Sequence, residues 1–424
     1  ALIVAPKGVY KNWHDIEMPV HLPEHVEHTK VLWEPTTTKK KQMELNTLFD
    51  DKGDLKVLIM NIEAFSTAKG LDFAERFLNI FMGKALIGID ESTTIKNPTA
   101  KRTKNILKIG NLASYRRILT GSPVTKSPLD LYSQCEFLDP YHLGHQSYYS
   151  FRARYANMIK RNFGGRSVQL VTSYRRLDEL ADKLDAFSYR VLKEDCLDLP
   201  PKIFTTRHIE LSDEQKEKYV TMKKSAIAEL DGKLMSSMSA LTTLLRLHQI
   251  TCGTFKADDG TVTPLKNNRL TSLMECLEET EGKVIIWATY REDLKNIVAA
   301  LKKAYGEAST VEYHGGVDAS LRQGYIAQFQ DVKGPARYFV GNPSTGGYGI
   351  TLTAANTVIY FSNSYDLEKR LQSEDRAHRI GQTGSVTYVD FIAESTIDER
   401  IVKSLKAKVN IANEIMGEDI KDWI

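Results

Sequence analysis

Two adjacent carboxylates, Asp90 and Glu91, stand directly after the apolar run "ALIGID" at residues 85–90. A run of this kind predicts a buried strand, so the two acids stand at its tip. In nucleotide-hydrolysing enzymes one carboxylate helps to hold Mg²⁺ and another aligns the attacking water. The pair therefore predicts half of such a site, with Asp90 near the metal and Glu91 as base.

The other half of the site would be a phosphate-binding loop of the form GxxxxGK followed by Ser or Thr. Its backbone N–H groups and one lysine cradle the phosphates. Gly-Lys occurs three times in the sequence, at Gly83-Lys84, Gly232-Lys233 and Gly282-Lys283. None is followed by Ser or Thr, and none has a glycine five residues earlier. The motif is absent from this sequence.

A second group of candidate residues lies far along the chain. The loop "NPSTGGYGITLT" at 342–353 carries Gly346, Gly347 and Gly349, which permit close backbone approach to a ligand. After it comes "LQSEDRAHRIGQ" at 371–382. On a helix its Gln372, Arg376 and Arg379 have i, i+4, i+7 spacing and share one face. Two guanidiniums there suit the charge that develops on a γ-phosphate. The alternative is a solvated basic helix that pairs with its own acids.

Two series of apolar, β-branched runs supply the elements that position these residues. The first lies at 1–6, 56–61, 85–90 and 116–121, and the second at 283–290, 309–316, 336–342, 357–363 and 386–392. Near-continuous runs of this kind predict strands covered on both faces, and the amphipathic segments between them predict helices. Alternation of strand and helix predicts parallel α/β sheets. We expect two α/β lobes with a mainly helical region between them. Within it, Ser212 and Gln215 predict a capped helix over 211–230.

Bulk composition is that of an ordinary globular protein. The 424 residues are 42% hydrophobic and 26% charged, and the net charge of +3 is too small to identify a partner. Four cysteines lie far apart without a CxxC pair, which favours reduced, buried thiols. No apolar run approaches the length of about 18–20 residues that a membrane-spanning helix needs.

Positive charge is concentrated at residues 147–176, "SYYSFRARYANMIKRNFGGRSVQLVTSYRR". The segment holds seven Lys or Arg, six aromatic residues and no acid. Phosphate contact and base stacking use this mixture, so Arg161 and Arg166 are candidate nucleic-acid contacts. The alternative is a solvated helical face whose aromatic residues turn inward.

Taken in order, the motifs resemble those of the Swi/Snf-type ATPases of helicase superfamily two, DNA translocases that include chromatin remodellers and annealing helicases. "LIVAPKGVYKNW" looks like motif Ia, "VLIMNIEAFS" like Ib, "DESTTIKNPTAKR" like II and "LTGSPVTKSPLDLYSQCEFLDP" like III. "IIWATYREDL" resembles motif IV, "STGGYGITLTAANTVIYFSNSYD" motif V and "QSEDRAHRIGQ" motif VI. The Asp-Glu box departs from the commoner Asp-Glu-Ala-His only at its third and fourth positions.

The resemblance implies a role for each matching residue. Asp90 would organise Mg²⁺ and Glu91 would act as base, while Arg376 and Arg379 would be arginine fingers. Gln372 would couple the second lobe to nucleotide. The nucleotide would be lined or sensed by Gly347, Gly349, Thr120, Gly121 and Ser122. The phosphate backbone of DNA would be contacted by Lys7, Ser344 and Thr345. ATP and Mg²⁺ would be the cofactors, with hydrolysis between two RecA-like lobes, and double-stranded DNA the partner, bound with little sequence preference.

The implied organisation is α/β throughout. Lobe 1 would cover residues 1–140, without its first strand and phosphate loop, and a helical protrusion would cover 141–200. A helical segment over 201–267 would lead into lobe 2, which would cover 268–393. A C-terminal brace helix would cover 394–424. We expect that the phosphate loop lies upstream of this sequence. A non-catalytic DNA-binding or scaffold protein on the same fold is the alternative. The compact spacing favours a bacterial or phage source and the cytoplasm, or the nucleus in a eukaryote.

Overall fold

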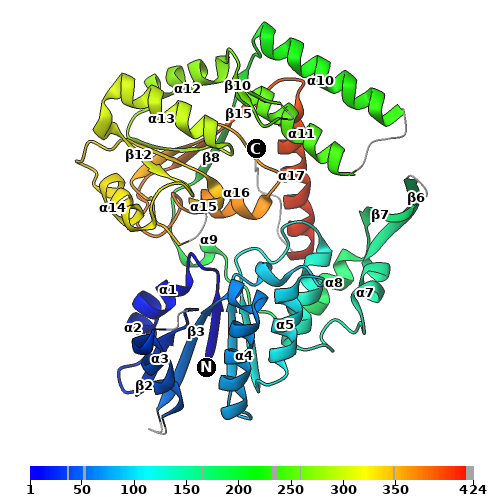
Figure 1. Cartoon of the computed structure of the whole chain (residues 1–424), viewed down its shortest axis with the longest axis vertical. Coiled ribbons are helices and arrows are strands. Elements are labelled where there is room, and N and C mark those ends of the chain that lie inside the picture. Colours follow the sequence, from blue (N-terminus) through cyan, green and yellow to red (C-terminus); the bar gives the residue numbers. More distant parts are fainter. Residues whose placement is uncertain are drawn as a thin grey trace. The chain divides into compact units, whose positions relative to one another are not determined.

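A computed structural model describes residues 1–35, 38–50, 54–163, 166–231, 237–257, 259–346 and 349–416 (Figure 1). The chain divides into two compact units. The first contains most of residues 1–189 together with the end of the last helix, from Asn410. The second contains Arg190–Val409 together with the short segment Asn162–Ser167. No helix within the described ranges is long and apolar enough to cross a membrane.

The first unit is built on a parallel sheet of five strands in the order β2-β3-β1-β4-β5. The strands are β1 (Leu2–Ala5), β2 (His28–Leu32), β3 (Leu55–Asn61), β4 (Leu86–Asp90) and β5 (Tyr115–Leu119). The helices are α1 (Tyr10–Asn12), α2 (Met18–His21), α3 (Lys39–Asn46), α4 (Ala68–Ile80), α5 (Lys101–Gly110), α6 (Leu131–Leu138), α7 (Tyr148–Tyr155) and α8 (Leu177–Asp185).

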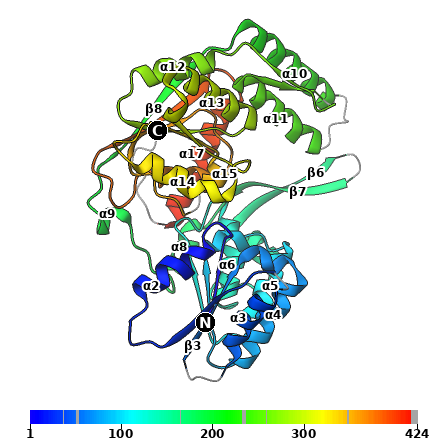
Figure 2. The same ribbon diagram turned by 60° about the vertical axis from the view of Figure 1, so that its left-hand side comes forward.

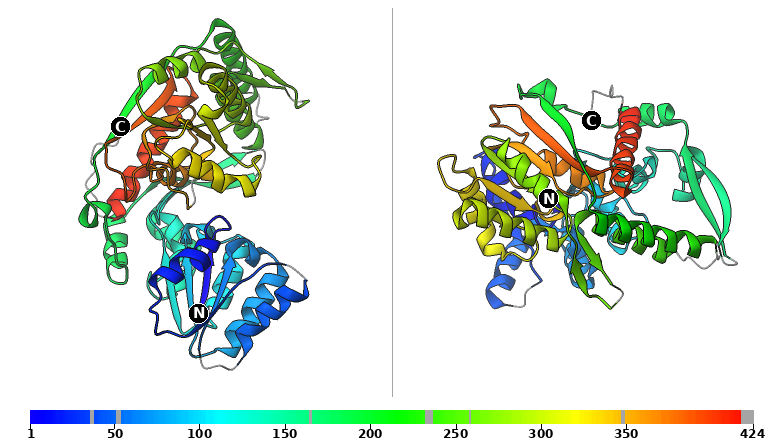
Figure 3. Two further views of the ribbon diagram at one scale, coloured as in Figure 1. Left: turned by 90° about the vertical axis from the view of Figure 1, so that its left-hand side faces the viewer. Right: turned by 90° about the horizontal axis from the view of Figure 1, so that it is seen from above.

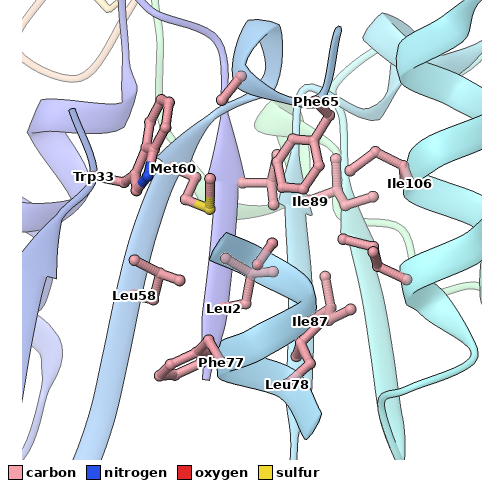
Figure 4. Close-up of a cluster of buried hydrophobic side chains, with 14 of the residues drawn as sticks. Leu2, Trp33, Leu58, Met60, Phe65, Phe77, Leu78, Ile87, Ile89 and Ile106 are labelled. Atoms are coloured by element: carbon pink, nitrogen blue, oxygen red, sulfur yellow. The ribbon is translucent and has the colours of Figure 1, made fainter. Parts of the chain in front are cut away.

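One face of this sheet carries the main core of the first unit. Side chains of β1, β3 and β4 pack there against α4 and α5, as Figure 4 shows for Leu2, Leu58, Ile87, Phe77 and Ile106. The intervening strand residues turn to the other face. There Ile3, Val57 and Ile59 meet Tyr10 and Trp13 from the segment after β1. Both faces are therefore covered, as the near-continuous apolar runs predict.

The second unit is built on a parallel sheet of six strands in the order β12-β13-β11-β14-β15-β8. The strands are β8 (Lys202–Ile209), β11 (Lys283–Trp287), β12 (Thr310–Tyr313), β13 (Tyr338–Gly341), β14 (Ala355–Tyr360) and β15 (Val386–Ala393), with a small hairpin of β9 (Thr254–Lys256) and β10 (Val262–Pro264). The helices are α9 (Lys193–Cys196), α10 (Asp213–Asp231), α11 (Ser237–Cys252), α12 (Asn268–Glu278), α13 (Arg291–Tyr305), α14 (Ala319–Gln330), α15 (Pro343–Gly346), α16 (Leu367–Glu374) and α17 (Ile397–Met416).

Successive residues of these strands enter two different cores. Val284 and Ile286 of β11 pack with α12 and α13, whereas Ile285 and Trp287 pack with α14 on the opposite face. The capped helix predicted at 211–230 is confirmed as α10. The Gln215 N–H donates to Ser212 Oγ at 3.2 Å, and the Ser212 N–H donates to Gln215 Oε1 at 3.1 Å.

Two parts of the predicted organisation are wrong. The range 141–200, expected to be helical, also contains a two-stranded hairpin of β6 (Ala156–Phe163) and β7 (Arg166–Tyr174), whose strands run side by side in Figure 2. The segment expected to be helical from residue 201 opens instead with β8, the edge strand beside β15. Polar residues occupy both faces of the hairpin and much of β8, so neither reads as an apolar run.

The last helix, α17, is a single continuous element (Figure 3). Its early residues Ile397, Ile401 and Leu405 belong to a core cluster of the second unit. Ile411, Ala412 and Ile415 belong to a cluster of the first unit, which also contains Phe151 and Leu180. The two ends of one helix therefore complete two different cores.

Candidate nucleotide and nucleic-acid site

Asp90 is the last residue of β4, and Glu91 follows it in a left-handed backbone conformation with φ 49° and ψ 58°. A residue with a side chain adopts this conformation at an energetic cost, and such residues are concentrated at functional sites. The Glu91 N–H donates to Asp90 Oδ1 at 2.9 Å, so the turn itself orients the first carboxylate.

Trp13 holds the other oxygen of Asp90. Its indole Nε1–H donates to Asp90 Oδ2 at 2.9 Å, from a short π-helix at Trp13–Glu17. Sequence reasoning missed this residue, because nothing in the motif around it marks a tryptophan as a partner for a carboxylate 77 positions away. Each oxygen of Asp90 uses one lone pair in these bonds. The remaining lone pairs are hard oxygen donors of the kind that Mg²⁺ prefers.

The segment after β5 contains Thr120, Gly121 and Ser122. The Ser122 N–H donates to Thr120 Oγ1 at 3.2 Å, and a side chain at Gly121 would meet nothing within 4 Å. The three residues therefore form a small turn at the end of β5, in which Gly121 is exposed and Thr120 and Ser122 are half-buried. Because β5 pairs in parallel with β4, with Asp90 beside Leu119, this turn lies at the same edge of the sheet as Asp90.

A hydrogen-bond network connects the turn after Asp90 to α6. Ser92 Oγ donates to Gln134 Oε1 at 2.7 Å, and Gln134 Nε2 donates to the carbonyl of Asp130 at 2.8 Å. Asp130 Oδ2 accepts from the backbone N–H of Lys126 at 2.7 Å, and Lys96 Nζ donates to Thr125 Oγ1 at 2.8 Å. All of these contacts lie within the first unit. They provide a direct physical connection between the Asp-Glu box and motif III.

In the second unit, the loop with Ser344 and Thr345 begins as the short helix α15. Asn342 fixes its start: Oδ1 accepts from the Ser344 N–H at 2.8 Å, and Nδ2 donates to the carbonyl of Thr289 at 2.9 Å. Ser344 is exposed and Thr345 is half-buried. A Cβ at Gly346 would lie 2.5 Å from the Trp287 ring, so this glycine is required by packing.

The two other glycines predicted from this loop are Gly347 and Gly349. Gly347 lies outside the described residues. Gly349 has φ +68°, a conformation that glycine adopts without strain. Gly346 and Gly349 therefore have local structural reasons to be glycine.

The prediction that Gln372, Arg376 and Arg379 share one helical face is wrong. The helix α16 ends at Glu374, so both arginines lie in the turns that follow it. The carbonyl of Arg376 accepts from the Leu352 N–H at 2.9 Å instead of continuing the helix. The Arg376 guanidinium donates to the carbonyls of Gln372 at 2.7 Å and Ile350 at 3.2 Å. Motif V and motif VI are joined in this way.

Arg379 has a different environment from Arg376. Its side chain is exposed and makes no hydrogen bond or ion pair with the rest of the described chain. Gln372 is half-buried, and its Oε1 has no hydrogen-bond partner among the described residues. Arg379 is therefore the guanidinium in this motif that is accessible to an anionic ligand.

A buried ion network, also missed from the sequence, supports motif VI. Arg370 donates to Asp390 Oδ2 at 3.0 Å, to Asn363 Oδ1 at 2.7 Å and to Glu374 Oε1 at 2.7 Å. Burial alone would lower the pKa of Arg370, but Asp390 raises it, so the guanidinium stays charged. The i, i+4 spacing of Arg370 and Glu374 was the signal available in the sequence.

The acids that the sequence offered as partners for the arginines of motif VI contact lysines, and Glu374 also pairs with Arg370 of its own helix. Lys202 of β8 lies 3.2 Å from Glu374, and Lys193 of α9 lies 2.6 Å from Asp375. Burial alone would raise the pKa of Asp375, but Lys202 and Lys193 hold it below its usual value. The alternative of a basic helix that pairs with its own acids therefore holds for Arg370 and Glu374, and it is not supported for the exposed Arg379.

The candidate nucleic-acid residues fall in two places. Lys7 is exposed in the turn after β1, at the sheet edge that also carries Asp90, because Val4 of β1 pairs with Ile89 of β4. Arg161 is exposed on β6, and Arg166 begins β7. Lys160 and Arg161 make no ion pair with the described residues. They place uncompensated positive charge on the hairpin.

The aromatic residues near the hairpin mostly serve the core. Phe151 and Tyr155 are fully buried, and Tyr148 and Tyr174 pack against the same cluster. Tyr149 is 70% exposed. Arg154 pairs with Glu179, and Arg175 donates to the carbonyl of Ala153 at 2.7 Å. The structure therefore supports inward-facing aromatics, with the available positive charge on a β-hairpin rather than on a helix.

Comparison with known proteins gives the family. Residues 1–255 match the SNF2-related domain, and residues 266–381 match the helicase conserved C-terminal domain. The chain is 29% identical over 340 residues to an uncharacterized ATP-dependent helicase of Mycoplasma genitalium, which covers 78% of this chain and 31% of that protein. It is 28% identical over 387 residues to the TATA-binding protein-associated factor MOT1 of Saccharomyces cerevisiae, which covers 78% of this chain and 20% of MOT1.

A solved structure, the Sulfolobus solfataricus SWI2/SNF2 ATPase core in complex with dsDNA, is 25% identical with a TM-score of 0.42. The match covers 98% of this chain and 83% of that one. The chain spans a fifth to a third of the length of the curated relatives named above. The SNF2-related match alone covers more than half of the chain, so the chain belongs to the SNF2-related family, the Swi/Snf-type branch of helicase superfamily two.

Proposed function

We propose that this chain is the core of a DNA-dependent ATPase that translocates on double-stranded DNA. The observation that carries the proposal is the Asp90–Glu91 pair at the carboxyl end of β4, with Asp90 oriented by Trp13 and by its own turn. A nucleotide-hydrolysing site needs such a fixed carboxylate beside a second one. The curated relatives include a DNA annealing helicase and endonuclease, ZRANB3 of Mus musculus, at 28% identity.

Asp90 would hold Mg²⁺ through the bound nucleotide, and Glu91 would orient the attacking water. When bound, the metal neutralises charge that develops on the phosphates. Arg379 would supply a further positive charge to the γ-phosphate, while Arg376, anchored on two carbonyls, keeps motif V and motif VI together. The sequence contains no phosphate-binding loop, so hydrolysis requires one from another segment or a partner.

DNA contact would come from Lys7, from the Ser344–Thr345 turn and from the basic hairpin. Backbone N–H groups, hydroxyls and lysines at loop positions contact phosphates without reading sequence. We therefore expect binding with little sequence preference and a steep dependence on salt. The relatives come from bacteria and eukaryotes; the compact spacing of the motifs supports a bacterial or phage source and action in the cytoplasm.

The test is phosphate release with and without duplex DNA, measured on the chain itself and on the chain fused to the phosphate-loop segment of a relative. We expect DNA-stimulated release from the fusion and a loss of at least 100-fold in its Glu91→Gln variant. Glu24→Gln, an exposed carboxylate outside the motifs of the first unit, is the matched control and should leave the rate unchanged.

The outcomes distinguish the ATPase proposal from the non-catalytic alternative. DNA binding without release from the fusion would favour the non-catalytic alternative and reject the ATPase proposal. DNA-stimulated release from the chain alone, abolished by Glu91→Gln, would support hydrolysis but contradict the requirement for an added phosphate loop. A duplex DNA versus duplex RNA competition would show which nucleic acid the site prefers.

A further inference from the structure

A cavity of about 430 Å³ lies in the second unit beside β12, and none of its lining residues is assigned above to nucleotide or DNA. Its walls come from both neighbouring helices and from the strand itself. The lining residues that matter are Lys302 of α13, Thr310 and Glu312 of β12, and Tyr325 and Gln328 of α14. Figure 1 labels β12, α13 and α14 together at one side of this unit.

The strand β12 is the edge of the six-stranded sheet, with β13 as its neighbour on one side. The Asn342 N–H donates to the carbonyl of Tyr313 at 3.2 Å, and Tyr313 is in register with Gly341. Backbone groups alternate along a strand, so Val311 and Tyr313 face β13. Thr310 and Glu312 therefore direct their N–H and C=O groups outward, away from the sheet.

The side chains place the cavity at the level of the sheet. Val311 and Tyr313 enter the core on the face that α14 covers, where Phe329 also packs. Glu312 turns to the other face, where Lys302 of α13 lies 3.4 Å from its carboxylate. The cavity is lined by α13, by α14, by β12 between them and by the segments that precede β12 and β13. A segment bound in it would therefore lie beside β12 near the amino-terminal end of that strand.

The charges around the cavity favour a basic occupant. Three carboxylates line it, those of Glu307, Glu312 and Asp331, against the single ammonium of Lys302. Lys302 already lies within 3.5 Å of Glu307 and 3.4 Å of Glu312. The lining therefore keeps a net negative charge, which complements lysine or arginine side chains.

We propose that the groove along β12 binds an extended, basic peptide segment of a partner protein, which pairs with Thr310 and Glu312 as an added strand. Main-chain hydrogen bonds to an exposed sheet edge supply affinity in this mode of recognition, and alternate side chains supply specificity. The lining offers Tyr325 and Pro335 for apolar contact. This binding site is independent of ATP hydrolysis and stands whether or not the proposed function is correct.

The experiment uses the capped hexapeptide acetyl-Lys-Val-Lys-Val-Lys-Val-amide and hydrogen exchange of the segment 309–314 followed by mass spectrometry. Saturating peptide should slow exchange of two amides, those of Thr310 and Glu312, by at least tenfold. The same peptide N-methylated at alternate residues cannot form the ladder and should bind at least tenfold more weakly. A Glu-Val peptide of equal length should also bind at least tenfold more weakly.

A matched pair of variants tests the protein side. Glu312→Gln keeps the outward N–H and removes one negative charge, so it should weaken binding of the Lys-Val peptide only modestly. Glu312→Pro removes that N–H without touching the bonds to β13, and should weaken binding further and leave one protected amide. Equal binding of the N-methylated or the Glu-Val peptide would overturn the proposal. Saturation of the wild-type protein without slowed exchange would also overturn it, and would favour a cavity for a small molecule instead.

Discussion

Trp13 is the residue whose role is most directly testable at the nucleotide site. Its indole donates to Asp90 Oδ2, and a hydrogen bond to a charged group contributes about 1.5–3 kcal/mol. Trp13→Phe keeps the aromatic ring and removes the donor. We expect about tenfold slower DNA-stimulated phosphate release in the phosphate-loop fusion, and a higher Mg²⁺ concentration for half-maximal rate.

Trp33→Phe is the control, because Trp33 packs in the core of the same unit and makes no contact with Asp90 in the structure. It should shift thermal stability and leave the Mg²⁺ dependence unchanged. If Trp13→Phe also leaves that dependence unchanged, Trp13 is a packing residue and does not position the carboxylate.

Asp293 is a buried carboxyl that no proposed function uses. It lies in the first turn of α13 and is 2% exposed. Neither of its oxygens accepts from an N–H or O–H group of the described residues, and the Cys252 thiol beside it is only a weak donor. Burial raises its pKa to about 8, although Arg269 acts in the opposite direction. The side chain is therefore neutral at neutral pH in the folded protein.

This carboxyl makes stability depend on pH in a defined direction. Between pH 6.5 and 8 the folded state keeps a proton on Asp293 that the unfolded chain has released, so stability falls as pH rises. The loss is about 1.6 kcal/mol over this window, because the limiting slope of about 1.4 kcal/mol per pH unit is halved when the pH reaches the folded pKa. Asp293→Asn should remove it in denaturant unfolding of the second unit.

The window is chosen to exclude His248, whose pKa burial lowers to about 4, so that its effect on stability lies below pH 6.5. Glu281→Gln, which changes an exposed carboxylate in the same unit, should keep the wild-type pH dependence. An equal loss of stability in Asp293→Asn and wild type would show that Asp293 is not the group that titrates.

At the scale of elements, the hairpin β6–β7 carries a charge that the structure leaves uncompensated. Lys160 and Arg161 are exposed, and the segment 147–176 contains no acid. Replacing both by Glu should weaken duplex DNA binding at least tenfold at 0.1 M salt. The slope of log K against log salt should fall by about 2, because two phosphate contacts are lost.

Lys303→Glu with Lys333→Glu is the matched control, since both lysines are exposed in the second unit and change the net charge equally. If the control weakens binding as much as the hairpin variant, the effect comes from overall charge. An unchanged affinity of the hairpin variant across the salt titration would remove the hairpin from the DNA-binding surface.

The sequence predicts nine of the eleven strands described in the two large sheets, since strands such as β4 and β11 are buried on both faces and read as continuous apolar runs. It misses β2, in which polar residues precede a short apolar end. It does not predict the hairpin, where polar residues face solvent on both sides. The Gly164-Gly165 pair in the sequence was the available turn signal. The edge strand β8 was missed for a related reason, because polar residues such as Lys202, Arg207 and His208 interrupt its apolar positions.

The candidate site was predicted in its residues but not in its geometry. Spacing alone placed Gln372, Arg376 and Arg379 on one helix, whereas tertiary contacts end α16 at Glu374. The Tyr388 hydroxyl donates to the Glu374 carbonyl at 2.9 Å, and Leu352 binds the Arg376 carbonyl. Both partners come from distant parts of the sequence, so a local pattern could not indicate where the helix ends.

At the scale of the whole molecule, each buried hydrophobic cluster formed by the described residues lies within one unit. Separate cores predict separate unfolding transitions. Phe77→Ala in the first unit and Leu277→Ala in the second should each cost about 2–5 kcal/mol. Differential scanning calorimetry should show that each variant lowers one transition and leaves the other in place. A single transition that both variants lower equally would contradict this prediction.

The path of α17 has a consequence for synthesis of the protein on the ribosome. The cluster around Phe151 and Leu180 also requires Ile411 and Ile415, which are translated more than 200 residues later. At about 5–20 residues per second, this delay is roughly 10–45 s. During that time the nascent first unit has one incomplete core with exposed apolar surface, which is a substrate for chaperones, and it becomes complete only when the last helix leaves the exit tunnel.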